Sequence, residues 1–138
     1  MKKKIIAGII TAVLVIICVI IYNFYFYTLH IDNPDEIVKI RYIDYHADVY
    51  EITDEDIVDE IIEDIDGMSF TRGQSLANQF FSTQRIEFID EEGYIKKRIR
   101  LFSDNGIISD DSHEYVSDEN IDTDYLFEVG TYAYNERD

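Results

Sequence analysis

The apolar run at the N-terminus constrains this chain more than any other feature. Three lysines at positions 2 to 4 precede a stretch from Ile5 to Ile21 without a charged side chain, and an aromatic stretch continues it to Tyr27. As a helix, about 23 residues at roughly 1.5 Å each extend on the order of 34 Å, enough to cross a bilayer core of roughly 30 Å. The sequence therefore predicts a membrane span from Ile5 through Ile21 to Tyr27, with an aromatic belt at its outer end.

A cleaved signal peptide and a lipid anchor are two other uses of such an N-terminus. The apolar run is longer than the roughly 7 to 15 residues of a typical signal core, and no small-residue cleavage site follows it. Cys18 follows Val15, Ile16 and Ile17 instead of small residues, so we interpret it as an apolar residue of the span. We expect a permanent signal anchor in residues 1–29, a short polar joint in 30–35 and a domain in 36–138.

The charges on either side of the span predict its orientation. Lysines precede it and the next basic residue is Lys39, which places the N-terminus in the cytoplasm and the domain outside the cell. Beyond residue 30 the chain has 29 acidic and nine basic residues, a net charge of −20. Such a field repels nucleic acid, so we exclude nucleic-acid binding. With Cys18 as the only cysteine, the domain must fold without a disulfide.

The domain reads as strands interrupted by one clear helix. Residues 53–67 carry an apolar stripe at helical spacing, with Thr53 as the expected N-cap and Gly67 as the stop. Alternation of apolar and polar residues predicts strands over 36–45, 49–52, 69–72, 85–90, 94–102, 107–108 and 114–116. We expect Lys96, Arg98 and Arg100 to pair with acidic side chains across the strands. Asn105-Gly106 predicts a tight type I′ turn.

The closing segment carries a second stripe at helical spacing. Ile121, Tyr125 and Leu126 begin it, and Tyr132 and Ala133 fall on the same face, with Ser117 or Asp118 as the expected cap. The resulting order is ββαββββα-like. It predicts an α+β domain in which two helices pack on one face of a mostly antiparallel sheet, behind an N-terminal transmembrane helix.

One stretch alternates acidic and amide side chains as a calcium-binding loop does. Its candidate ligands are Asp118, Asn120, Asp122 and Asp124. The residue where such a loop needs glycine is Thr123, and the residue where it needs a bidentate glutamate is Val129. We therefore predict capping of a helix by acidic residues and no metal site.

The residues that zinc or nucleophilic catalysis needs are absent. The chain has three histidines and one cysteine, and it contains no zinc-ligand spacing, nucleophile elbow or phosphate-binding loop. We expect no catalytic residues, no cofactor and no enzyme activity. Phe80 and Phe81, in a segment without periodicity, are candidates for contact with a partner.

Three segments follow one another within residues 36–108: ITDEDIVDEIIEDI, SFTRGQS and IEFIDEEGYIKKRIRLFSDNG. This arrangement resembles small signal-anchored or lipidated extracytoplasmic domains of unknown function from Gram-positive bacteria. Many of those domains have a lipidated cysteine where this chain has a span, and the closing segment is only loosely comparable. The resemblance implies placement at the cell surface and carries over no catalytic residue.

These observations together predict a single-pass membrane protein that presents an acidic, non-enzymatic domain to a protein, peptide or envelope partner outside the cell. One alternative is an immunity or regulatory subunit that acts on another membrane protein through its span, where Gly8, Thr11 and Ala12 form a small-residue face. A low-affinity calcium-binding surface domain is a further alternative.

Overall fold

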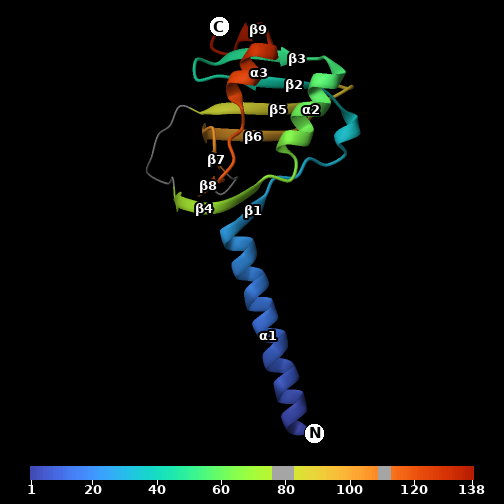
Figure 1. Cartoon of the computed structure of the whole chain (residues 1–138), viewed down its shortest axis with the longest axis vertical. Helices are drawn as coiled ribbons and strands as arrows, with labels where there is room; N and C mark the ends of the chain where they lie inside the picture. Colours follow the sequence, from blue (N-terminus) through green and yellow to red (C-terminus); the bar gives the residue numbers. More distant parts are fainter. Residues whose placement is uncertain (76–82, 109–112) are drawn as a thin grey trace.

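A long helix carries the domain in the computed structural model, which describes residues 1–75, 83–108 and 113–138. Helix α1 (Lys2–Tyr25) projects away from the rest of the chain, and none of its side chains is buried (Figure 1). Its mean hydropathy over 18 residues is 3.1, so α1 is long and apolar enough to cross a membrane. This agrees with the predicted span, except at its outer end.

The outer end of that segment belongs to the sheet. Strand β1 (Phe26–Thr28) follows α1 directly and pairs with β4 (Ser69–Ser75), with Tyr27 opposite Phe70. Leu29 and Ile31 are 0% exposed and lie in the main core. The predicted boundaries differ from this arrangement, because residues 26–31 are part of the fold, whereas the sequence placed the domain start at residue 36 after a polar joint. Aromatic residues suit a membrane interface and a strand equally well, and composition alone does not separate the two.

Among the described residues, nine strands form one antiparallel sheet. Their order is β1-β4-β8-β7-β6-β5-β2-β3-β9, with β1 nearest α1 and β9 at the far edge (Figure 1). The short helix η1 (Pro34–Glu36) leads into the sheet. The remaining strands are β2 (Ile37–Ile43), β3 (Asp48–Ile52), β5 (Gln84–Asp90), β6 (Ile95–Ser103), β7 (Gly106–Ile108), β8 (His113–Val116) and β9 (Thr131–Asn135). The strands expected from alternation are confirmed, while β1 and β9 were not predicted.

Two helices, α2 (Glu55–Ile65) and α3 (Thr123–Val129), contribute to one core on the same face of the sheet. Helix α2 buries Val58, Ile61, Ile62 and Ile65, as its stripe predicted. Its N-cap is Asp54 and not Thr53, because the Asp54 backbone is extended and its carboxylate accepts the amide N–H groups of Asp56 and Ile57. The α+β class with two helices on one face is confirmed.

The C-terminal helix is shorter than predicted. Helix α3 is capped by Asp122 and not by Ser117 or Asp118, and it ends at Val129. Tyr132 and Ala133 lie in β9, which pairs with β3. The helical spacing predicted the wrong conformation beyond Gly130. At Gly130 the chain passes close to β3, because a Cβ added to this glycine would lie 2.8 Å from the Tyr50 Cβ. Strand pairing decided the conformation of these residues.

The turn between β6 and β7 also differs from its prediction. A type I′ turn needs positive φ at both central residues, and neither Asp104 nor Asn105 has it. Gly106 instead pairs with Ser103 inside the sheet. A Cβ there would overlap the Phe102 ring, so glycine provides space for an aromatic side chain and not a left-handed turn.

Candidate functional site

The predicted cation ligands precede α3 or lie in its first turn, and they do not converge on one point. Asp122 accepts the Tyr125 amide at 3.0 Å and thereby caps the helix, while Asp118, Asn120 and Asp124 are exposed. Within residues 1–75, 83–108 and 113–138, no three acidic, histidine or cysteine side chains are placed to hold a metal ion. Val129, which stands at the glutamate position of a calcium loop, packs against the core.

The other predicted residues have separate positions. Ile5 and Ile21 are exposed on α1, as a span in contact with lipid requires. Phe80 and Phe81 lie outside the described residues. Tyr27, predicted as the outer end of the span, instead packs in the domain, with its ring centroid 5.4 Å from that of Tyr115.

Side chains of the domain contact the C-terminal end of α1 and connect it to the sheet. The Arg72 guanidinium lies 3.6 Å from the centre of the Phe24 ring, and its Nη1 donates to the Phe24 carbonyl oxygen at 3.3 Å. Lys97 Nζ donates to the Tyr27 hydroxyl at 3.3 Å. These contacts join the last turn of α1 to β4 and β1 to β6, so α1 enters the domain without a free linker.

A groove of about 300 Å³ lies between α2 and α3. Its floor is apolar and belongs to the main core: Ile61, Ile65, Met68, Ile121 and Leu126. Its rim is polar and mostly acidic: Asp64, Glu119, Asn120 and Asp122. Asn120 and Asp122, which were candidate calcium ligands, and their neighbour Glu119 therefore face α2 across the apolar floor of the groove.

The electrostatic field at this groove is negative. Neither α2 nor α3 contains a basic residue. The Tyr125 hydroxyl donates to Glu60 Oε2 at 3.2 Å and links the two helices at the groove. Desolvation and the Glu60 carboxylate raise the pKa of Tyr125, so its hydroxyl remains a donor at neutral pH.

The groove matches the chemistry of a basic side chain. A lysine or arginine stem can lie on the apolar floor while its charged end pairs with the acidic rim. Among the described residues that line the groove there is no histidine, cysteine or serine, and hence no serine–histidine or cysteine–histidine pair. The arrangement is suited to binding.

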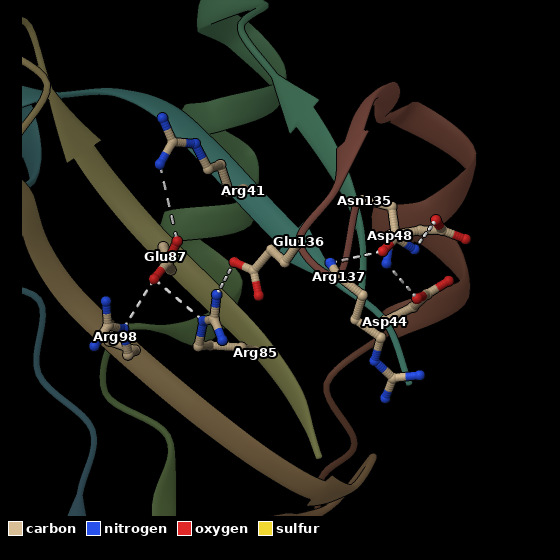
Figure 2. A network of polar contacts seen from close by, with 9 residues as sticks. All are labelled: Arg41, Asp44, Asp48, Arg85, Glu87, Arg98, Asn135, Glu136 and Arg137. Atoms are coloured by element: carbon tan, nitrogen blue, oxygen red, sulfur yellow. Dashed lines mark hydrogen bonds and ion pairs between the residues drawn. The ribbon is translucent and has the colours of Figure 1, made fainter. Parts of the chain in front are cut away.

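The opposite face of the sheet has a different charge pattern. Glu87 of β5 is 3% exposed and lies among three arginines, in front of the sheet as Figure 2 shows. Its Oε2 is 2.8 Å from Arg98 Nε and 3.2 Å from Arg85 Nε, and its Oε1 is 4.0 Å from Arg41 Nη1. The expected cross-strand pairing is confirmed for Arg98 with Glu87 and for Lys96 with Asp90, which lie 3.5 Å apart. We call Arg41, Arg85, Arg98 and Arg100, with Glu87 at their centre, the arginine face.

Sequence reasoning missed the groove because its two walls are more than 50 residues apart and meet only in the fold. The available signal was the absence of basic residues from both helical stretches. The arginine face was partly visible, since alternation placed Arg98 and Arg100 on one side of β6. The contribution of Arg41 and Arg85 depends on the strand order, which the sequence does not show.

Comparison of the chain with protein-family models, curated proteins and solved structures gives no match. The resemblance to Gram-positive extracytoplasmic domains therefore stays an expectation.

Proposed function

We propose that this protein is a single-pass membrane protein with a cytoplasmic N-terminus, whose acidic domain lies outside the cell and binds a basic segment of a partner protein in the α2–α3 groove. The domain is non-enzymatic. One observation carries the binding role: an apolar floor and an acidic rim lie together on a face without basic residues in either helix.

The membrane placement rests on α1 and its flanks. None of the 24 residues of α1 is buried, although Arg72 of β4 contacts Phe24 in its last turn. Three lysines form the first turn of this helix, and all 29 acidic residues follow it. A lipid environment supplies the missing partner for α1, and the lysines favour the cytoplasmic side.

Labelling of intact cells tests the orientation. In a Cys18→Ser background, a cysteine placed at exposed Tyr94 should react with a membrane-impermeant maleimide, while a cysteine at Lys3 should react only after lysis. Reaction of the Lys3 position alone in intact cells would reverse the topology.

Binding of a defined peptide tests the groove. The full chain, in nanodiscs of neutral phosphatidylcholine, is titrated with a fluorescent peptide of alternating lysine and leucine, and anisotropy is measured. Asp64→Lys should weaken binding on the order of tenfold, because it reverses a charge at the rim. Glu91→Lys changes the net charge equally at the exposed β5–β6 turn and is the matched control. Equal weakening by both variants would show that only net charge matters and would exclude the groove.

The same measurements separate this function from a regulatory role of the span. A partner that contacts only α1 remains bound when Asp64 is changed and is lost when the face of Gly8, Thr11 and Ala12 is replaced by leucines. A partner of the groove shows the opposite pattern.

A further inference from the structure

The two faces of the sheet are complementary in charge. On the helix side, α2 exposes Asp56, Asp59, Glu60, Glu63 and Asp64, which we call the acidic face. On the other side lies the arginine face. This separation stands out in a domain of net charge −20, because four of its nine basic residues gather on three adjacent strands.

The arginine face keeps an excess of positive charge after its internal pairs are formed. Arg85 pairs with Glu136 at one rim, and Lys39 Nζ pairs with Glu51 Oε2 at 2.8 Å. Glu87 is shared by Arg41, Arg85 and Arg98, while no carboxylate among the described residues lies within ion-pair distance of Arg100. Arg98 is bound through Nε only, and its side chain is 51% exposed. The outer ends of Arg98 and Arg100 are therefore available to an external acidic group.

The buried Glu87 restrains the side chain of Arg98. Because Glu87 holds the Nε edge of Arg98, the guanidinium is fixed in one orientation before any partner arrives. A fixed guanidinium loses less conformational entropy on binding than a free one.

The anchor makes the two faces available to neighbouring copies. The strands lie across the axis of α1 and stack along it, so both faces of the sheet stand upright when α1 crosses a membrane (Figure 1). Helix α2 packs over β2, and the arginine face lies on β2, β5 and β6, so the two charged faces are at the same height above the membrane. A sideways translation of one copy brings its acidic face to the arginine face of the next without inverting the anchor.

We propose that neighbouring copies of this chain in one membrane pack front to back, with Arg98 and Arg100 of one copy as the basic side chains that meet the acidic face and the α2–α3 groove of the next. The inference rests on the proposed function and names a second copy as a partner of the groove. Contacts between two acidic faces or two arginine faces are repulsive, which disfavours a closed two-fold dimer. A front-to-back contact leaves one free face at each end, so the assembly is an open row.

Energy transfer between full-length chains in neutral phosphatidylcholine vesicles tests this contact. Donor and acceptor dyes are placed on a cysteine at Asp138 in the Cys18→Ser background, and transfer is compared with that expected for random proximity. The unaltered faces should give transfer above random and a cross-linking ladder that extends beyond the dimer.

Charge-reversal variants on the two faces test which surfaces are in contact. Arg100→Glu and Asp64→Lys should each weaken association about tenfold. A mixture of the two variants should restore it, because each brings the face that the other lacks. Arg98→Gln is a second variant of the arginine face, and it introduces no negative charge beside Glu87. Glu91→Lys is the charge control. Near-ultraviolet circular dichroism confirms that each variant is folded.

Several outcomes would overturn the proposal: random transfer for the unaltered chain, a ladder that stops at the dimer, no restoration in the mixture, or an equal loss with Glu91→Lys. Transfer that survives every face variant would assign association to α1. Failure of the proposed function is distinct, because the lysine–leucine peptide would then fail to bind, whatever the energy transfer.

Discussion

Tyr42 of β2 shows how a single polar group is held in the core. The side chain is 5% exposed, and its hydroxyl donates to Gln84 Oε1, while Thr123 of α3 lies close enough to form a hydrogen bond with it. Desolvation, and then the Asp44 carboxylate, raise the pKa of Tyr42 to about 12. The buried hydroxyl lies beneath α3, and its hydrogen bond joins β2 to β5. The hydroxyl can donate this hydrogen bond only while it keeps its proton.

The stability of the domain should therefore depend on pH in the alkaline range. The pKa in the folded state lies above the unfolded value of 10, so the contribution of Tyr42 is complete below pH 10 and is lost as pH rises from 10 to about 12. The loss is on the order of 2 to 3 kcal/mol. Thermal unfolding, followed by tyrosine near-ultraviolet circular dichroism, should show a smaller decrease in Tm over this range for Tyr42→Phe. Tyr94→Phe, which alters an exposed ring, should keep the full decrease; equal slopes for all three proteins would contradict this account.

At the scale of elements, α2 shows which signals in a sequence are sufficient. Its stripe is long, its polar face is continuous, and an acidic cap and a glycine mark its ends, so local preference and tertiary packing agree. The error of one residue at its N-cap is local, since Thr53 and Asp54 both carry suitable oxygens.

Asp54 is the better test of that helix end. Its Oδ1 accepts the amides of Asp56 at 3.0 Å and Ile57 at 3.3 Å. Asp54→Ala should lower the free energy of unfolding by about 1 kcal/mol, because two amide groups lose their acceptor. Thr53→Ala, the residue that the sequence favoured, should change it by only a few tenths of that amount. Urea titration of the full chain in detergent compares the two, and a larger effect of Thr53→Ala would contradict the assigned cap.

The elements that the sequence missed are the two edge strands of the sheet. Phe26–Thr28 continues an apolar helix, and Thr131–Asn135 continues a helical stripe, so each was assigned to its neighbour. Both acquire their conformation from pairing with strands elsewhere in the chain, β4 and β3. For the same reason the groove, and the contribution of Arg41 and Arg85 to the arginine face, could not be predicted from the sequence: they depend on strand order and not on local pattern.

On the scale of the whole molecule, the apolar helix α1 and the domain are one continuous structure. Tyr25 ends α1, Phe26 begins β1, and Leu29 is already in the core. The boundary at residue 29 that the sequence suggested therefore passes through the fold.

Two truncations distinguish these boundaries. A chain that begins at Phe26 retains β1 and Leu29 and should show cooperative unfolding in water. A chain that begins at His30 loses the edge partner of β4 and a fully buried leucine, and should be less stable by on the order of 3 kcal/mol or more. Urea titrations of both compare them. Equal stability would show that β1 adds nothing to the domain.

The pairing of β1 with β4 also orders events during synthesis. The chain emerges N-terminus first, and β1 lies beside the anchor from the beginning, but its partner arrives more than 40 residues later. The opposite edge waits for β9, close to the C-terminus. Strand β4 joins the rest of the sheet through β8, so β1 and β4 together become one margin of the complete sheet only after residues 113–116 have been synthesised. We therefore expect folding to begin in the interior hairpins and to finish at the two edges of the sheet, which stay open to chaperones and proteases until then.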